Sequence, residues 1–398
     1  MSSGIARRVT LAAGTSCDLG ASSARIVGMP LSAKKLRQEK KKIAELEVVT
    51  DPEEAAEEAG LRYVSDDKPG YTRKRRGKKF IYFDTEGKQI KDETRILRLN
   101  RLAIPPAYKD VWICPSPIGH LQATGIDDRG RKQYRYHERW RAERDENKYE
   151  KMVVFGQALP KIRRRLTRDL KKRGLPREKV IATVVELLEK TLIRIGNEEY
   201  AKENKSFGLT TMRGRHVDVK GETLRFRFRG KSGIEHDIGV QDRRVARIVR
   251  KLQDLPGQEV FQYLDEEGER HQVTSDDVNE YLHKITGEEF TAKDFRTWAG
   301  TVMAAMALQN QEAFENKSQA KKNVKTAIKA VATMLGNTPA VCRKCYVHPA
   351  VLETYLDGSL IEGLKKRTEK TLEESLGNLR SEEVAVLAFL QERLEAKK

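Results

Sequence analysis

Six side chains between positions 194 and 346 are of types that can act together on a phosphodiester. A guanidinium is always charged and offers forked donors, which suits a phosphorus centre where negative charge develops. A lysine can protonate a departing oxygen, an amide can donate to a nonbridging oxygen, and a tyrosine can attack phosphorus once its phenol loses its proton. The six residues are Arg194, Lys231, Lys293, Arg296, Asn337 and Tyr346.

Taken singly, these residues have simpler interpretations. Arg194 could be a solvated helix residue, Lys231 an ordinary turn lysine, and Arg296 one partner of a surface salt bridge. Their combination with residues 336–346 (GNTPAVCRKCY) changes the interpretation. In that segment a tyrosine follows an asparagine by nine residues, at a helix start marked by glycine and proline.

The other motifs favour neither a metal nor a nucleotide cofactor. Cys342 and Cys345 have C-x-x-C spacing but no second pair at zinc-site distance, so two ordinary thiols are the simpler interpretation. No HExxH, GxxxxGK[ST] or GxGxxG motif occurs in a suitable context. We therefore predict no metal, no cofactor and no use of ATP. Because Cys345 directly precedes Tyr346, a further hypothesis is that oxidation there displaces the tyrosine.

Five elements together resemble the type IB DNA topoisomerases of bacteria and poxviruses. Their spacings of 37, 65, 41 and 9 residues are similar to the family pattern, and the resemblance extends from about residue 70 to residue 390. One tetrapeptide would mean little, but five in register are specific. The elements are IRIG with Arg194, FRGKSG with Lys231, KDFRTW with Arg296, GNTP with Asn337, and Tyr346.

The resemblance implies a reaction on double-stranded DNA. Tyr346 is expected to form a 3′-phosphotyrosyl link and release a 5′-hydroxyl, with Lys231 as the general acid. Lys293, on the same helix face as Arg296, could assist the proton relay. Rotation of the free end and religation would relax supercoils without ATP. Stabilisation of the transition state is implied for Arg194, Arg296 and Asn337.

Further DNA contacts are expected from the resemblance and from charge. The segment 130–137 (GRKQYRYH) resembles the family's DNA-clamping strand, although an aromatic strand face packed on a core is the alternative. The basic segment 158–173 and the loop 73–79 should follow phosphates and bind less tightly as salt increases. An arginine comb on one strand should do the same. The implied contacts are Gln133, Tyr134, Tyr136 and Tyr200, and the comb is Arg225, Arg227 and Arg229.

Departures from the family pattern and two rival functions bear on this prediction. Poxvirus members carry His where this chain has Asn337, and lysines near the first Arg are here Asn197 and Glu199, so a poxvirus-like sequence preference is not expected. A tyrosine recombinase usually has His three residues before the second Arg, where this chain has Lys293, which favours the topoisomerase. A non-catalytic nucleoid-binding protein would explain the charge but not the five elements in register.

The elements that must position these residues begin with a β-rich part. A helix is expected to start at Asp51-Pro52, and the cationic stretch 68–79 is expected to be a loop. Residues 128–130 form a hairpin signal between two strands. The expected strands are 80–84, 111–114, 120–127 and 131–137.

From Phe155 onward the periodicity is helical. Residues 158–173 form a basic segment, and 177–196 predict a core helix that includes Ile195. A β meander at 208–219, 223–230 and 234–240 follows, with alternate residues of its second strand apolar and basic. Further helices are expected near 243–254, 275–286, 291–312, 318–335, 346–356 and 380–396.

We therefore predict an α+β fold that forms a clamp around DNA. A small β-rich N-terminal DNA-clamp domain (61–150) is expected to be joined, through a connector near 150–157, to a mainly helical catalytic domain (156–398) with a small antiparallel sheet. Residues 1–60 are expected to be a flexible, basic extension. Within it, a transit peptide and a translation start at Met29 both remain open.

The composition agrees with a nucleic-acid partner. The chain has 77 Lys and Arg against 59 Asp and Glu, a formal net charge of +18, and such an excess attracts polyanions. No apolar run is long enough to cross a bilayer, and four cysteines are too few for a disulfide scaffold. We expect a monomer in the bacterial cytoplasm, at the nucleoid, that binds double-stranded DNA and no membrane.

Overall fold

A computed structural model describes residues 52–77, 79–128, 130–311, 314–364 and 379–397 of the protein. Most of the predicted extension 1–60 lies outside these residues. The described chain separates into two compact units, one ending at Lys151 and one over Met152–Lys398. Helices and small antiparallel sheets make up both units, so the α+β class is confirmed.

The first unit contains the four predicted strands and one that was not predicted. Its three-stranded sheet has the order β3 (Lys109–Ile113), β4 (Leu121–Ile126) and β5 (Lys132–Tyr136), and β4 and β5 form the expected hairpin. Residues 68–79, predicted to be a loop, instead contribute β1 (Thr72–Arg76), which pairs antiparallel with β2 (Lys79–Phe83).

Basic residues form β1 because their side chains have partners on the sheet. The guanidinium of Arg73 lies 4.0 Å from the centroid of the Phe80 ring and donates to the carbonyl oxygens of Ile104 and Pro105. Charge alone therefore did not decide between loop and strand. The unit also has α2 (Pro52–Glu58), as predicted, and α3 (Glu93–Arg101), which the sequence analysis missed.

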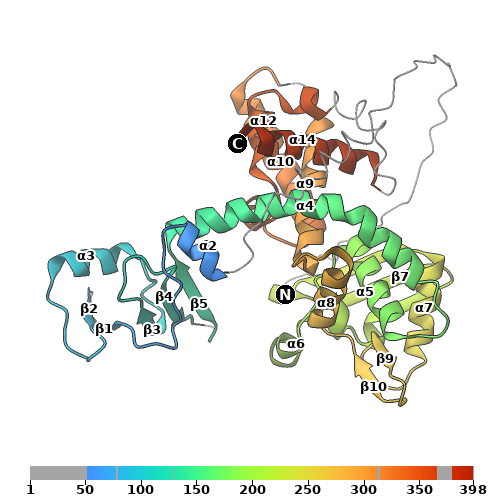
Figure 1. Cartoon of the computed structure of the whole chain (residues 1–398), viewed down its shortest axis with the longest axis horizontal. Coiled ribbons are helices and arrows are strands. Elements are labelled where there is room, and N and C mark those ends of the chain that lie inside the picture. Colours follow the sequence, from blue (N-terminus) through green and yellow to red (C-terminus); the bar gives the residue numbers. More distant parts are fainter. Residues whose placement is uncertain (1–51, 78, 129, 312–313, 365–378, 398) are drawn as a thin grey trace, which may run out of the picture. The chain divides into compact units, whose positions relative to one another are not determined.

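The boundary between the two compact units falls at 151/152, inside the predicted connector 150–157, and the connecting residues are helical. A single helix, α4 (Glu138–Asp169), continues through them and includes Pro160 (Figure 1). Proline removes one backbone hydrogen bond, but apolar residues at helical spacing on both sides are buried and hold the helix on its core. These residues are Met152, Phe155, Leu159, Ile162 and Leu166.

In the second unit, the C-terminal part of α4 is followed by α5 (Arg177–Thr191) and by a sheet of order β6 (Val217–Lys220), β7 (Thr223–Arg229), β8 (Glu235–Gln241). The predicted alternation in β7 is confirmed, because Leu224, Phe226 and Phe228 are buried. Of the predicted strand 208–219, only the end is a strand, since Leu209–Thr211 and Gly214–His216 form two short 3-10 turns. The elements α6 (Glu198–Asn204), β9 (Gln262–Leu264) and β10 (Arg270–Gln272) were not predicted.

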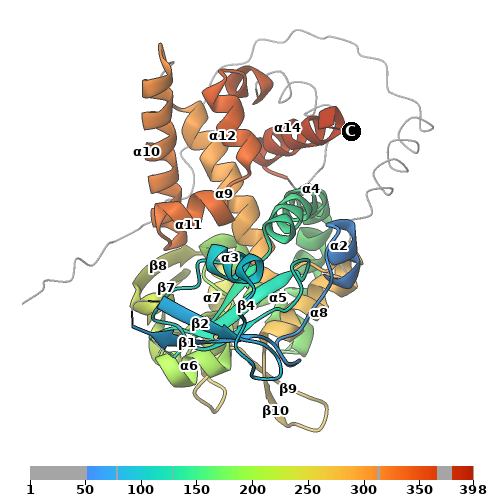
Figure 2. The ribbon, with the colours of Figure 1, turned by 90° about the vertical axis from the view of Figure 1, so that its left-hand side faces the viewer.

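Helix α9 (Ala292–Gln309) lies beside α10 (Lys317–Leu335) and is the helix against which several of the remaining helices pack (Figure 2). The predicted helix 346–356 is wrong at its start. Residues 346–348 separate α11 (Pro339–Cys345) from α12 (Pro349–Leu356), since a residue before proline avoids helical geometry. The other helices are α7 (Arg243–Gln253), α8 (Ser275–Thr286) and α14 (Ser381–Lys397). Among the described helices, none has the length and apolarity of a membrane span.

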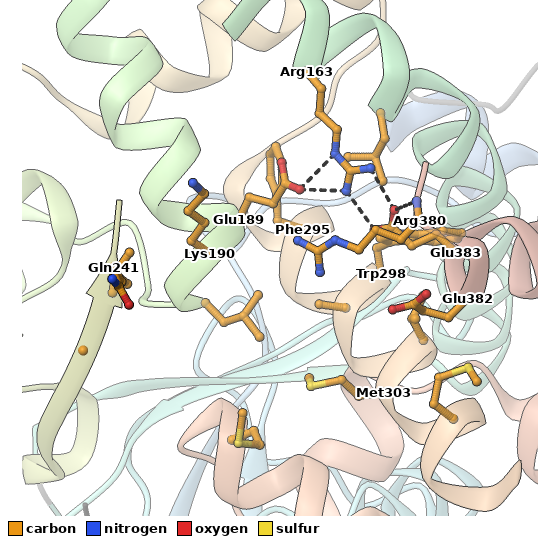
Figure 3. Close-up of a pocket in the computed structure, with 18 residues that line it drawn as sticks. Arg163, Glu189, Lys190, Gln241, Phe295, Trp298, Met303, Arg380, Glu382 and Glu383 are labelled. Carbon is orange, nitrogen blue, oxygen red and sulfur yellow. Dashed lines mark hydrogen bonds and ion pairs between the residues drawn. The ribbon is translucent and has the colours of Figure 1, made fainter. Parts of the chain in front are cut away.

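An ion-pair network fixes three helices of this unit together. Arg163 of α4 contacts Glu189 of α5 at 2.7 Å and Glu383 of α14 at 2.8 Å (Figure 3). Burial alone would raise the pKa of Glu383, but the hydrogen bonds and charge of Arg163 outweigh burial and hold that pKa below its ordinary value. Arg163 is therefore a structural residue, although it belongs to the basic segment 158–173.

Replacing Arg163 by Met should destabilise the protein strongly. Two carboxylates would remain in the interior without their cation, a change that costs about 3–5 kcal/mol of unfolding free energy. Urea unfolding at neutral pH measures this cost. The exposed neighbour Arg164→Met is the control and should change stability by less than about 0.5 kcal/mol.

The same network makes wild-type stability depend on pH. Because the folded-state pKa of Glu383 is lowered, its contribution is complete above the ordinary glutamate value and is lost as pH falls through the folded value. In Arg163→Met the main cause of the lowering is gone and burial, which raises the pKa of Glu383, is no longer offset by that cation, so this acid-side loss should disappear. Identical pH profiles of stability for the two proteins would contradict this assignment.

Candidate active site

Arg194 lies in an extended segment and not in a helix, which corrects the prediction for 177–196. Helix α5 ends at Thr191, and Leu192 adopts the left-handed conformation with φ 55°. The carbonyl oxygens of Arg194 and Ile195 accept from the amides of Leu209 and Thr210, at 3.0 and 2.7 Å. The backbone that carries Arg194 is thus held against the turn at 208–211.

Glycine is needed where these two segments meet. A Cβ atom on Gly208 would lie 2.5 Å from the carbonyl oxygen of Arg194, closer than atoms pack. Gly196, with φ +101°, allows the chain to turn away after Ile195. The glycine of the IRIG motif therefore allows residues 194–196 to lie against residues 208–210, and this contact sets the position of the Arg194 side chain.

Lys231 lies at the tip of the β7–β8 hairpin, as predicted. The turn is closed by a hydrogen bond of 2.8 Å from the Gly230 amide to the Ile234 carbonyl oxygen. The Lys231 side chain is exposed, and the described part of the chain holds no acidic partner within ion-pair distance. Its ammonium is therefore available to an incoming group.

Arg296 is almost completely buried at the start of α9, with 4% of its surface exposed. It donates to the carbonyl oxygen of Leu192, and to that of Leu335 at 2.7 Å. Burial, followed by the charge of Arg194, lowers the pKa of Arg296, while Tyr346 opposes the shift. The orientation of the guanidinium is thus fixed by the C-terminal ends of two helices, at Leu192 after α5 and at Leu335 of α10.

Asn337 follows α10 and contacts Arg194 directly. Gly336 ends the helix in the left-handed conformation (φ 59°), and the Asn337 amide donates to Ala332. The Asn337 Oδ1 accepts from Arg194 at 2.5 Å. Its Nδ2 is buried and has no hydrogen-bond partner within the described residues. The side chain therefore retains an unused donor beside Arg194.

Tyr346 caps the C-terminal end of α11, and its backbone amide donates to Cys342 at 2.9 Å. Its ring lies 5.1 Å from the Arg296 guanidinium. Helix α9 packs tightly against its backbone, because a Cβ on Gly300 would lie 2.5 Å from the Tyr346 carbonyl oxygen. The position of the phenol is therefore set by two helices, α9 and α11.

One cavity of about 330 Å³ brings five of the six predicted side chains together. Asn337 adjoins this group through Arg194. A larger cavity of about 630 Å³ contains none of the six and is lined by the Arg163 network and by apolar side chains of α9 (Figure 3). We take the smaller cavity as the candidate site because the predicted chemistry converges there. Its predicted lining residues are Arg194, Lys231, Lys293, Arg296 and Tyr346.

The predicted DNA contacts of the first unit do not share one strand face. Alternation along β5 places Gln133 opposite to Tyr134 and Tyr136. Gln133 donates to Asp127 at 3.0 Å. Tyr134 is 47% exposed, whereas Tyr136 packs on a small cluster that includes Trp140. Of the three, Tyr134 is the side chain that the structure leaves most open to a partner.

The arginine comb is partly neutralised by an acid that the sequence analysis missed. Arg225 makes two hydrogen bonds of 2.6 Å to Asp237 on the neighbouring strand, and Arg227 lies 3.7 Å from the same carboxylate. Arg229 is exposed. Tyr200 lies in the short helix α6. The strand register, which places Arg227 directly opposite Asp237, is the signal that could have revealed this pairing.

A second missed residue is His236, also on β8. It borders a small cavity lined by Arg194, Lys231 and Arg296. Burial, with the charges of Arg194 and Arg296, lowers the pKa of His236 to about 4. The imidazole is therefore uncharged at neutral pH.

Comparison with known proteins places this geometry in context. A model of the catalytic core of eukaryotic DNA topoisomerase I matches residues 137–375, and a model of the N-terminal domain of bacterial DNA topoisomerase IB matches residues 79–127. The DNA topoisomerase 1B of Acanthamoeba polyphaga mimivirus is 33% identical over 293 residues, covering 72% of this chain and 87% of the relative. That of Vaccinia virus is 22% identical over 263 residues, covering 66% and 80%.

Proposed function

Because this chain belongs to the type IB family of DNA topoisomerases, we propose that it relaxes supercoiled duplex DNA by a transient single-strand break, without ATP or metal. The activity class, a type IB topoisomerase and hence an isomerase, follows from the family. The roles of individual residues are part of the proposal. The observation that carries them is the convergence of Arg194, Lys231, Lys293, Arg296 and Tyr346 on one cavity.

Tyr346 is the proposed nucleophile. The phenol gives its proton to solvent, its oxygen attacks the scissile phosphorus and forms an O–P bond, and the bond from phosphorus to the 5′ oxygen breaks. The Arg296 guanidinium lies 5.1 Å from the centroid of the Tyr346 ring, so a cation lies beside the proposed nucleophile. The phosphotyrosyl link keeps the energy of the original phosphodiester, so the reverse attack by the 5′-hydroxyl reseals the strand without an external energy source.

Lys231 is the proposed general acid, with Lys293 as a possible assistant. The departing 5′ oxygen leaves as a hydroxyl when it receives a proton from the lysine, and the lysine recovers that proton during religation. An exposed lysine on a hairpin tip can reach such an oxygen without rearrangement of the protein core.

Arg194, Arg296 and Asn337 are proposed to stabilise the pentacoordinate transition state. Their donors are positioned before the substrate arrives, and preorganised donors of this kind lower a barrier in which negative charge develops. Asn337 can donate to a phosphoryl oxygen only through its Nδ2, because its Oδ1 is an acceptor and already receives a hydrogen bond from Arg194. A nonbridging oxygen there would satisfy the unused donor.

DNA binding is proposed to involve both units, which act as a clamp, with exposed Tyr134 and Arg229 as the best-supported contacts among those predicted. Gln133, Tyr136, Tyr200, Arg225 and Arg227 remain proposed contacts, although Arg225 and Arg227 already face Asp237. The match to a bacterial N-terminal domain supports a proposed location at a bacterial nucleoid. We also propose that the protein acts as a monomer.

Replacing Asn337 by Ala should slow strand cleavage by about 10²–10³-fold, as does loss of one positioned donor to a transition-state oxyanion. Single-turnover cleavage of a DNA duplex measures this rate. Asn337→His restores a donor and should recover part of the lost rate. An Asn337→Ala protein that cleaves as fast as wild type would exclude this residue from the reaction.

Relaxation of a supercoiled plasmid in EDTA and without ATP tests the overall function. The proposal requires relaxed topoisomers and a covalent protein–DNA complex when the reaction is stopped with detergent. Recombination between specific sites would favour the recombinase. Folded protein that binds the plasmid but changes no linking number would favour a non-catalytic DNA-binding protein.

A further inference from the structure

The ring of His236 fills the space between two backbone segments that carry proposed catalytic residues. His236 lies on β8 directly opposite Phe228 of β7, and the two rings stack with centroids 4.9 Å apart and planes 17° apart. One ring edge faces Gly230, which precedes Lys231. Another faces Gly336, which precedes Asn337.

The imidazole occupies the space where a Cβ atom of either glycine would lie. A Cβ on Gly230 would lie 2.7 Å from Cδ2 and Nε2 of His236, and one on Gly336 would lie 2.8 Å from Cε1. Gly336 also has a positive φ, which favours glycine by itself. Gly230 has φ −97° and ψ −168°, a conformation open to any residue. Only the approach of the imidazole therefore requires glycine at position 230.

The two segments are held by different parts of the fold. Gly336 and Asn337 are attached to the end of α10, and Asn337 is bonded to Arg194. The Lys231 turn is a hairpin tip with an exposed lysine. It is held at Gly230, whose amide donates to Ile234 and whose carbonyl oxygen accepts from the Gly233 amide and from Ser206 Oγ. Because the rigid ring lies against both segments, it sets the distance between the end of α10 and the turn.

The imidazole can do this without disturbing the charges around it. The charged groups that line the small cavity beside it are Arg194, Lys231 and Arg296, all cations. An uncharged ring adds no fourth positive charge to this group, whereas a lysine or arginine here would repel its neighbours.

We propose that His236 is a positioning residue, whose uncharged ring holds the Lys231 turn at the distance that proton transfer to the 5′ oxygen requires. The inference rests on the proposed role of Lys231 as general acid. It assigns to His236 no bond to DNA and no proton transfer of its own.

A sulfur-substituted substrate gives a readout specific to this role. Cleavage sites are first mapped with the wild-type protein, and one is prepared as a duplex whose bridging 5′ oxygen is replaced by sulfur. Attack by Tyr346 then forms the O–P bond and breaks the P–S bond, and the thiolate leaves without receiving a proton. Loss of a general acid, or of its positioning, should matter little on this duplex.

His236→Ala should slow single-turnover cleavage of the oxygen duplex by about 10–100-fold, a range that misplacement of a catalytic group by about 1 Å can cause. On the sulfur duplex His236→Ala should cleave within about threefold of wild type. His236→Phe, which keeps a ring, should cleave both duplexes within about threefold of wild type. His283→Ala, an exposed histidine of α8, is the matched control.

A double-mutant cycle tests the contact itself. Gly230→Ala should slow cleavage of the oxygen duplex when His236 is present, because the new methyl group meets the ring and pushes the turn. In the His236→Ala background the same change should have a smaller effect, since the space is then free. If His236→Ala does not fold, Gly230→Ala alone is tested: it should cleave the oxygen duplex slowly and the sulfur duplex at a rate near that of wild type.

The outcomes separate the inference from the proposal on which it rests. If Lys231→Ala is not rescued by sulfur, the general-acid role itself fails. If Lys231→Ala is rescued but His236→Ala is equally slow on both duplexes, only the inference about His236 is overturned. Wild-type rates for His236→Ala on the oxygen duplex, or additive effects in the cycle, would also overturn it.

Discussion

Tyr346→Phe should abolish plasmid relaxation and covalent complex formation while leaving DNA binding intact. The substitution removes only the phenolic oxygen, and loss of a nucleophile can reduce turnover on the order of 10⁵-fold or more. The remaining ring can still pack beneath Arg296, where the guanidinium lies 5.1 Å away, so the cavity should keep its shape. Detergent-trapped complex, linking number and a binding isotherm measure the three quantities.

Tyr263→Phe is the matched control for this experiment. Tyr263 lies in β9, where its ring stacks on His271, and it does not line the candidate cavity. It should relax DNA at the wild-type rate. If Tyr346→Phe still forms a detergent-stable complex with DNA, another residue is the nucleophile and the proposed mechanism is wrong.

Arg296→Lys should lose on the order of 10³-fold or more in cleavage rate, although it retains a positive charge. The guanidinium reaches two carbonyl oxygens, of Leu192 and Leu335, and also lies over the tyrosine ring. A lysine ammonium has no planar fork and cannot make these contacts from the same position. The charge would therefore move away from the phosphate site.

A loss of folding must be separated from a loss of catalysis in this variant. An unsatisfied buried carbonyl costs about 1–3 kcal/mol, so urea unfolding should show some destabilisation of Arg296→Lys. The comparison should be made where the variant is fully folded. Arg243→Lys, an exposed arginine at the start of α7, should cleave within about twofold of wild type. Near-wild-type cleavage by Arg296→Lys would show that charge alone suffices.

The N-terminal strands and the alternation of β7 were predictable because the pattern of each is local. Leu224, Phe226 and Phe228 alternate with arginines over seven residues, and a strand is the conformation that separates the two sets. The β1 strand and the continuous helix α4 were not predictable in this way. Arg73 depends on Phe80 and Ile104, and Pro160 is accommodated by packing, so both outcomes depend on long-range contacts.

The end of α5 shows the same limit in the site itself. The apolar spacing of Ile181, Val184, Leu188 and Ile195 continues to the end of the predicted helix, yet the helix stops at Thr191. The backbone of 194–195 is bonded instead to residues 209 and 210, which are distant in sequence. The periodicity of apolar residues predicts which side chains are buried, but it does not predict which backbone groups form hydrogen bonds with each other.

The sequence by itself determined the family, the type of reaction and the six candidate side chains, because reactive residue types at specific spacings can be recognised along the chain without knowledge of the fold. Only the tertiary structure decided which donors are engaged and which remain free. Arg296 is anchored by the carbonyl oxygens of Leu192 and Leu335, Asn337 keeps one unused donor, and Arg225 is neutralised by Asp237. These outcomes depend on distances between segments that are far apart in the chain, and spacing along the chain does not contain those distances.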